Sequence, residues 1–254
     1  MLTASIVQTA TAHAAARGAL QPIATQSVVI EDAGARFVVR AASTIAAKAA
    51  APARADPLGD YEPELFVADV GSAHYVLLNK YPVSANHLLI VTRRFAPQEE
   101  LLDADDFQAL SALMAGLDWL AFYNAGRVAG ASQARKHLQL VPLPLAPEVP
   151  ASVPLESLIT RGTLPFRHSV AALPSLDAMH RIYRELIAQS PAAPYNLLAT
   201  RRLMLVVPRR QERYRSISIN ALGFAGSLFV RNAAELELVR SAGPMKVLRA
   251  VTLE

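Results

Sequence analysis

The 254-residue sequence contains no cysteine, and this absence removes three kinds of chemistry at once. Disulfide bonds, thiolate zinc sites and cysteine nucleophiles all need that residue. The sequence also lacks an uninterrupted run of about 18 to 20 apolar residues, the length that a membrane-spanning helix requires. No basic segment precedes the early alanines, because the first basic residue is Arg17. We therefore expect a soluble, cytoplasmic protein with no membrane association.

Lysine is scarce, and 21 of the 25 basic residues are arginine in a chain of net charge +4. The planar guanidinium group binds phosphate with two donors, which suits a nucleotide or a nucleic acid. A general bias toward alanine and arginine explains the composition more simply. The basic residues are scattered, and no basic stripe is interleaved with aromatic residues as in single-strand binders. The pattern therefore argues against nucleic acid as a partner.

The first half of the sequence favours strands and one helix. Residues 28–40 are typical of a hairpin, and prolines make 41–63 an irregular connector. The apolar runs 75–78 and 87–91 predict two neighbouring central strands. Apolar spacing of three and four residues predicts a helix from the cap Asp103 to about residue 124, with Trp119 in the core.

Prolines between residues 142 and 154 exclude a helix and mark the clearest linker in the chain. We therefore divide the sequence into residues 1–150 and 151–254. The second part again shows helical and strand-like patterns, at 176–187, 203–207, 216–220 and 235–240. The order of strands, helix and strand in each half suggests a structural duplication without shared residues. The fold class is α+β with antiparallel sheet.

The most informative stretch is a strand-like segment at 136–141 that follows a glycine-bearing loop at 126–133. Side chains alternate between the two faces of a strand, so Arg135, His137 and Gln139 share one face. Lys136 points to the opposite face, where we expect it to be solvated.

The loop before this strand contains Gly130, Ser132 and Gln133. Glycine and small polar residues let backbone N–H groups approach an anion closely. The loop and the polar strand face together indicate a site for phosphoryl groups.

Residues 130–142, Gly-Ala-Ser-Gln-x-x-Lys-His-Leu-Gln-Leu-Val-Pro, resemble the signature of the diadenosine tetraphosphate phosphorylases (ATP adenylyltransferases) of the histidine-triad superfamily. Other segments resemble the family in the same order, at 17–23, 77–83, 86–92, 195–198 and 219–226. The resemblance implies a histidine-triad-like antiparallel sheet in the first half. It implies an ATP-adenylyltransferase-like second half that lacks the catalytic motif and packs with the first into one compact unit.

The sequence departs from the family pattern at two places. Arg135 replaces the first histidine of the motif, and an expected Asn-Pro-Phe segment reads Asp56-Pro57-Leu58. We expect Arg135 to hold a phosphate or to lower the pKa of His137, since a nearby cation disfavours imidazolium.

The family resemblance implies a function in which His137 attacks an α-phosphate and forms a covalent nucleotidyl-histidine. Gln139 stands where the third histidine of the triad stands in other families of the superfamily. Its amide donates to the phosphate without titrating. This favours transfer to an acceptor over hydrolysis. We expect phosphorolysis of diadenosine tetraphosphate to ATP and ADP, with inorganic phosphate as the acceptor.

The resemblance places further substrate-binding residues around this centre. Lys48 matches the family's N-terminal phosphate-binding lysine, and Ser132 and Gln133 are expected phosphate donors. The other expected substrate-binding residues lie on the nucleoside side or along the phosphate chain, namely Asn79, Lys80, Asn86, His87, Asn124, Gly130 and Arg135. No covalent cofactor and no protein-bound metal are implied, and magnesium is expected only as a companion of the polyphosphate.

Two other functions fit the same residues. One is a nucleotidyltransferase that uses another acceptor, such as sulfate or a sugar phosphate. The other is a nucleotide-binding regulator with impaired catalysis, which the Arg135 departure motivates. The sequence leaves the preferred dinucleotide, the direction of the reaction and homo-oligomer formation open.

Overall fold

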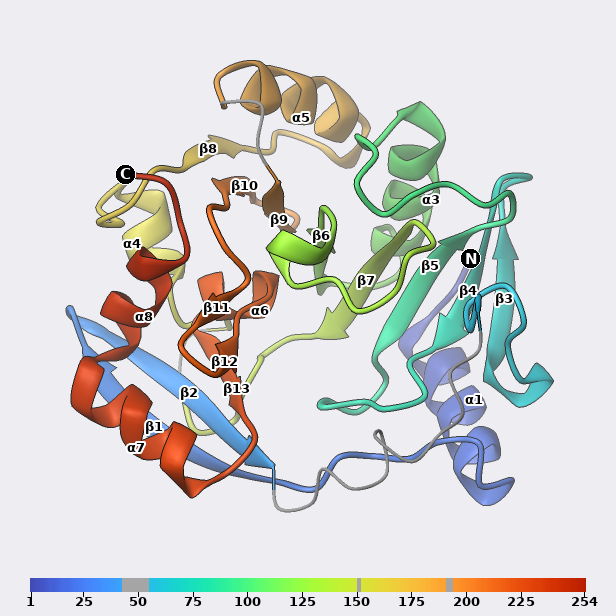
Figure 1. Cartoon of the computed structure of the whole chain (residues 1–254). Helices are drawn as coiled ribbons and strands as arrows, with labels where there is room; N and C mark the ends of the chain where they lie inside the picture. The colour runs from blue at the N-terminus through green and yellow to red at the C-terminus, as the bar shows by residue number, and fades with distance from the viewer. Residues whose placement is uncertain (43–54, 150–151, 191–193) are drawn as a thin grey trace.

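Apolar runs form the strands of a central eight-stranded sheet in the computed structural model, which describes residues 1–42, 55–149, 152–190 and 194–254 (Figure 1). All neighbouring strands of this sheet are antiparallel. The predicted α+β class with antiparallel sheet is confirmed. In spatial order the strands are β3 (Phe66–Val70), β4 (His74–Leu78), β5 (Leu88–Thr92), β7 (His137–Pro142), β6 (Trp119–Asn124), β9 (Tyr195–Ala199), β10 (Leu203–Pro208) and β8 (Ser169–Ala172).

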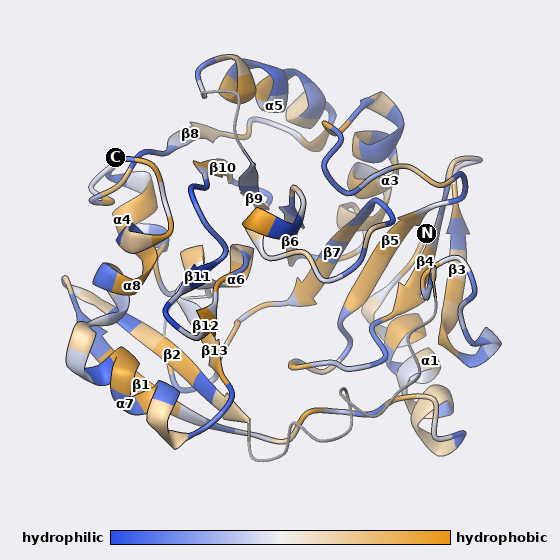
Figure 2. Cartoon of the chain, viewed as in Figure 1, coloured by the Kyte–Doolittle hydropathy of each residue, from blue (hydrophilic) through white to orange (hydrophobic). Residues whose placement is uncertain are grey.

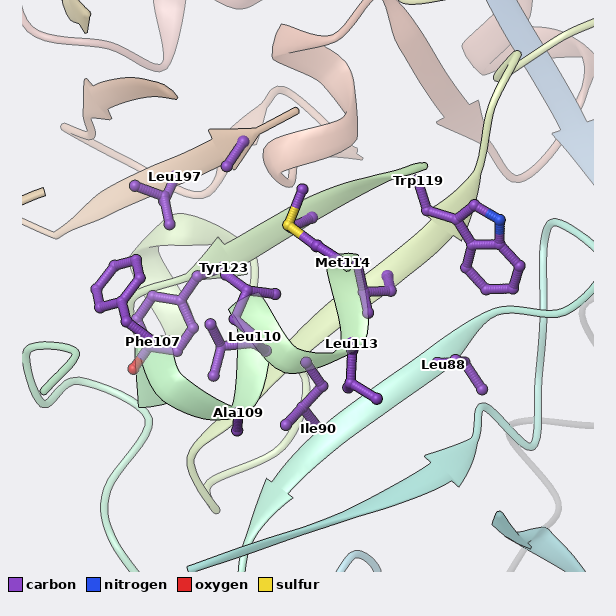
Figure 3. Packing of buried hydrophobic residues seen from close by; sticks show 14 of the residues in the cluster. Leu88, Ile90, Phe107, Ala109, Leu110, Leu113, Met114, Trp119, Tyr123 and Leu197 are labelled. Carbon is purple, nitrogen blue, oxygen red and sulfur yellow. The ribbon is translucent and has the colours of Figure 1, made fainter. Parts of the chain in front are cut away.

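Apolar side chains cover large parts of both faces of this sheet, and β5 is a continuous hydrophobic run up to its last residue, Thr92 (Figure 2). One face packs against α1 (Ala4–Ala16), α3 (Ala104–Met114) and α5 (Met179–Ala188). Figure 3 shows Leu110 and Leu113 of α3 on the side of the helix that faces Ile90 of β5, with Phe107 close to Tyr123 of β6.

A smaller sheet and four helices cover the other face. The predicted hairpin is confirmed as an antiparallel pair, and the third strand of this sheet joins it in parallel. The elements on this side are β1 (Thr25–Asp32), β2 (Ala35–Ala42), β13 (Ser227–Val230), α4 (Glu156–Thr160), α6 (Ala221–Phe224), α7 (Ala233–Ala242) and α8 (Pro244–Ala250).

Short elements complete the described chain. They are the 3-10 turns η1 (Pro63–Leu65), η2 (Arg127–Ala129) and η3 (Leu176–Ala178) and the strands β11 (Arg213–Tyr214) and β12 (Ile217–Ser218). The strand predicted at 216–220 is therefore reduced to the two residues of β12. Among the described residues, none of the helices has the length and apolarity that crossing a membrane requires.

The prediction of one helix from Asp103 to about residue 124 is wrong at its C-terminal end. Asp103 caps α3 as expected, in a reciprocal capping box with Asp106, but the helix ends at Met114. Trp119 begins strand β6, whose residues are all buried. A strand covered on both faces is apolar throughout, so its residues match helical spacing equally well.

The expectation that Lys136 is solvated is also wrong. Its side chain is 2% exposed, and its ammonium group lies 2.5 Å from a carboxylate oxygen of Asp106. The second oxygen of Asp106 lies 2.8 Å from Nε2 of His74. Strand alternation gave the correct face for Lys136, but helix α3 covers that face and supplies the counter-charge.

We expect Asp106→Ala to lower the free energy of unfolding by about 3 to 5 kcal/mol, because it leaves the Lys136 ammonium buried without its carboxylate. Urea unfolding at neutral pH measures this loss. Asp105→Ala, at an exposed position one residue earlier, is the matched control and should cost far less. Equal urea midpoints for the two variants would contradict the assignment of Asp106 as the counter-ion of Lys136.

The same ion pair has a defined pH dependence. Burial raises the pKa of Asp106, but hydrogen bonds from His74 and Lys136 outweigh that effect and hold the pKa below the ordinary value of 3.8. A carboxyl with a depressed pKa stabilises the fold above its unfolded-state pKa and loses this contribution as the pH falls. The difference in the free energy of unfolding between the parent and Asp106→Ala should therefore be constant near neutral pH. It should become smaller only below about pH 4.

Candidate active site

His137 begins strand β7, between β5 and β6, and its ring is almost completely buried. Nδ1 lies 2.8 Å from the carbonyl oxygen of Arg135, so the ring donates its proton there and leaves a lone pair on Nε2. Burial lowers the pKa of His137, while the hydrogen bond to the carbonyl acts in the opposite direction. The residue is therefore a neutral imidazole with a nucleophilic Nε2 at neutral pH.

Gln139 lies on the same strand face as His137 and is oriented by His87. Nε2 of His87 lies 2.9 Å from Oε1 of Gln139, and Nδ1 of His87 lies 3.2 Å from the amide nitrogen of Asn79. An amide oxygen accepts and an amide nitrogen donates, so His87 carries its proton on Nε2. Burial lowers the pKa of His87 to about 4, which keeps this arrangement neutral. The amide nitrogen of Gln139 is left to donate elsewhere.

A pocket of about 270 Å³ brings Asn79, Asn86 and His87 together. Its walls are mainly apolar and come from α1, from the segment after it and from the β4–β5 connection. Asn86 has a positive φ of 58°, a backbone conformation that asparagine tolerates better than most residues. The pocket suits a flat, partly apolar group such as a nucleoside.

Lys80 was also expected near the substrate, and its ammonium group pairs with Glu62 at 2.6 Å. It does not line this pocket. Lys48 lies outside the described residues, so the expectation for it stays a prediction.

The loop that precedes β7 packs against the second part of the chain. Gly130 has a φ of 90°, and a Cβ there would lie 2.5 Å from the carbonyl oxygen of Ile219. Only glycine fits both conditions. Asn124 holds the same region, because its Oδ1 accepts from the Asn196 side chain and from the Ala221 backbone, both at 2.8 Å.

Ser132 and Gln133 differ from these buried residues. Ser132 is exposed and Gln133 is half-buried. No side-chain hydrogen bond of either residue occurs within the part of the chain that the structure describes. Their polar groups are thus available to a ligand that approaches the loop.

Arg135 pairs with Asp56, so the two departures from the family pattern contact each other. Nε of Arg135 lies 3.0 and 2.9 Å from the two carboxylate oxygens, and a terminal nitrogen lies 2.5 Å from one of them. Its other terminal nitrogen donates to the carbonyl oxygens of Thr92 and Arg93. These contacts favour a structural role, and direct binding of phosphate stays a prediction.

Arg135 acts on the pKa of His137 through its carbonyl group and not through its guanidinium charge. Burial lowers that pKa, and the contribution of Arg135 is its carbonyl group, which raises it. The guanidinium is directed to Asp56 instead.

No sequence pattern indicated Gln98, whose buried side chain contacts the backbone of His137. An isolated glutamine between Pro97 and an acidic pair belongs to no periodic pattern or motif. Only the assembled sheet reveals where it lies.

A double-mutant cycle on Asp56→Ala and Arg135→Ala tests the buried pair. We expect a coupling of about 1 to 3 kcal/mol in the free energy of unfolding, because the contact is bidentate and mostly buried. The exposed pair of Arg93 and Asp69 is the matched control, with an expected coupling below about 1 kcal/mol. A coupling near zero for Asp56 and Arg135 would contradict this assignment.

Comparisons with known proteins relate this geometry to characterised enzymes. The chain is 28% identical over 234 residues to diadenosine 5',5'''-P1,P4-tetraphosphate phosphorylase 2 of Saccharomyces cerevisiae, covering 72% of this chain and 70% of that protein. It is 27% identical to Protein APA1 of the same yeast over 226 residues, covering 71% and 70%.

Solved structures share the fold along nearly the whole chain. The crystal structure of yeast Ap4A phosphorylase Apa2 in complex with AMP superposes with a TM-score of 0.84 at 24% identity, covering 98% of this chain and 95% of that one. The complex of the same enzyme with Ap4A gives a TM-score of 0.83 at 24% identity, covering 98% and 96%.

Family models account for the entire sequence. Residues 1–161 match the Ap4A phosphorylase N-terminal domain, and residues 162–254 match the ATP adenylyltransferase C-terminal domain. The chain therefore belongs to the Ap4A phosphorylase family, with its N-terminal and C-terminal domains in one polypeptide.

Proposed function

We propose that the protein converts diadenosine tetraphosphate and inorganic phosphate to ATP and ADP through AMP bound covalently to His137. The observation that carries this proposal is the buried, neutral imidazole whose Nδ1 is held by the Arg135 carbonyl. The similarity of the protein to a yeast phosphorylase and to structures of Apa2 with AMP and with Ap4A supports the choice of substrate.

Two displacements at one α-phosphorus make up the reaction. Nε2 of His137 forms a bond to the α-phosphorus, and the bond from that phosphorus to the bridging oxygen breaks, so ATP leaves. An oxygen of inorganic phosphate then attacks the same phosphorus, ADP leaves, and His137 regains its lone pair. Covalent catalysis of this kind replaces one difficult step with two easier ones.

Donors around the phosphorus supply the stabilisation that this reaction needs. Negative charge spreads over the equatorial oxygens in the transition state, and fixed donors lower its energy. We assign this task to the amide nitrogen of Gln139, which the bond between Oε1 and His87 orients, and to Ser132 and Gln133. The pocket with Asn79 and Asn86 receives the nucleoside, and Lys48 remains our candidate for the phosphate chain.

We also propose that the fold is histidine-triad-like and arose by duplication, with parts at residues 1–150 and 151–254 packed into one unit. The successions α3–β6–β7 and α5–β9–β10 have the same order, and each ends in an antiparallel strand pair. The two units meet where β6 pairs with β9. Strands β9 and β10 contain no histidine, so only the first unit carries the nucleophile.

Magnesium enters the site with the polyphosphate in this proposal, and the reaction takes place in the cytoplasm. Within the described ranges, no group of three or more histidine, cysteine, aspartate or glutamate side chains is placed to hold a metal ion. Formation of a homo-oligomer stays a prediction.

The His137→Ala variant should convert no dinucleotide and form no covalent adenylate, because it lacks the attacking nitrogen. Product analysis with labelled diadenosine tetraphosphate, with and without phosphate, measures turnover, and denaturing electrophoresis detects the labelled protein. His13→Ala, at an exposed position on α1, is the matched control and should behave like the parent.

Other outcomes of this assay separate the competing functions. Turnover by His137→Ala at the parent rate would disprove the covalent mechanism. Turnover of the parent with sulfate or a sugar phosphate but not with inorganic phosphate would show that the acceptor is not inorganic phosphate. Nucleotide binding by the parent without any adduct would indicate a regulator.

The pH dependence of adduct formation follows from the burial of His137. The nucleophile must be neutral, and burial lowers its pKa from 6.5, so the acid limb of the rate should have its midpoint below pH 6.5. Single-turnover rates between about pH 4 and 8 measure it. A midpoint at or above 6.5 would show that the ring is solvated.

A further inference from the structure

We propose that Gln98 is a positioning residue for the nucleophile, holding the peptide of His137 as a missing strand partner would. The inference rests on the proposed function of His137. It concerns a residue outside the loop and strand that form the motif, in the irregular segment between β5 and α3.

The ladder between β6 and β7 ends two positions before His137 would be paired. It runs from Trp119 opposite Pro142 to Phe122 opposite Gln139. In the same register Tyr123 would face Leu138 and Asn124 would face His137. These pairs are absent from the β6–β7 ladder, so the buried N–H and carbonyl of His137 need other partners.

The Gln98 side chain supplies these partners. Its Oε1 accepts from the N–H of His137 at 2.8 Å, and its Nε2 donates to the carbonyl oxygens of His137 at 3.1 Å and Asn124 at 2.9 Å. A primary amide has the donor and acceptor of a peptide, so one side chain bridges the opened strands. Gln98 is 1% exposed, and water cannot substitute for it without a cavity.

The backbone of Gln98 is itself fixed. Its N–H donates to the carbonyl oxygen of Ala134 at 2.8 Å, and its own carbonyl accepts from the hydroxyl of Tyr123 at 2.6 Å. The neighbouring segment follows β7, because Pro97 forms an isolated bridge with Arg135. The amide is therefore presented from a rigid support.

The consequence for the chemistry is geometric. The ring of His137 is fixed at Nδ1 by the Arg135 carbonyl, and its peptide is fixed by Gln98. Loss of the amide would leave the buried N–H and carbonyl of His137 without these partners, whereas the Asn124 carbonyl would still accept from the N–H of Gly126 at 2.9 Å. The strand would then move to satisfy the two groups of His137. A displacement of about 1 Å at a nucleophile costs about 10²-fold in rate.

The Gln98→Met variant tests this role, because methionine fills a similar volume without hydrogen-bonding groups. We expect the rate of adduct formation per folded molecule to fall by about 10²-fold, with little change in the affinity for the dinucleotide. Gln108→Met, on the exposed side of α3, is the matched control and should keep the parent rate. Circular dichroism at the assay temperature gives the folded fraction.

The Gln98→Glu variant adds a pH signature that a purely structural residue would not give. An ionised carboxylate still accepts from His137 but repels two carbonyl oxygens, whereas a protonated carboxyl can donate to one of them. Burial raises the pKa of such a carboxyl. The rate of this variant relative to the parent should therefore increase as the pH falls.

Independent readouts keep this inference separate from the proposed function. A parent that forms no adduct overturns the function, and NMR of the His137 ring then tests Gln98 alone. A ring pKa that rises toward 6.5 in Gln98→Met but not in Gln108→Met supports the positioning role, since a loosened strand admits water. An unchanged ring pKa, or an unchanged rate per folded molecule in an active parent, overturns it.

Discussion

The hydrogen bond from Nδ1 of His137 to the Arg135 carbonyl is the contact on which the proposed catalytic geometry depends. It spans only two residues, so it is useful only if the backbone between them cannot move. Each residue of this short segment is anchored to a different element. The Arg135 side chain binds Asp56, Lys136 binds the first turn of α3, and the His137 peptide binds Gln98. Asp56 and two sites in the segment 98–106 thus converge to fix one imidazole.

The second part of the protein contributes to this site without a nucleophile of its own. Arg209 is almost fully buried and donates to the carbonyl oxygen of Ala129 and to the side chain of Asn196, which also binds Asn124. Burial lowers the pKa of Arg209 to about 9, with Glu212 acting in the opposite direction. The glycine loop therefore rests on a cation enclosed by backbone carbonyls. These contacts join the glycine loop to strand β9 and to the segment after β10.

Sequence patterns predicted the structural features that depend on residues close together in the chain. The hairpin, the strand pair β4–β5, the Asp103 cap and the shared face of His137 and Gln139 all follow from local periodicity or capping. The end of α3 was missed because a strand buried on both faces imitates helical spacing. Contacts across the sheet, such as Gln98 with His137, have no local signal. Such contacts form only where two paired strands separate or where a helix covers one face of the sheet.

The departure at Arg135 illustrates the same limit at the level of chemistry. Taken alone, an arginine two residues before the nucleophile suggests a phosphate ligand or a cation that depresses the histidine pKa. The fold directs its guanidinium to Asp56 and to two carbonyl oxygens, so most of its donors are used within the protein. Removing either partner of this mostly buried pair would leave the other charge without its counter-ion, which is destabilising. The two departures therefore support each other, and burial is what lowers the pKa of the proposed nucleophile and keeps it neutral.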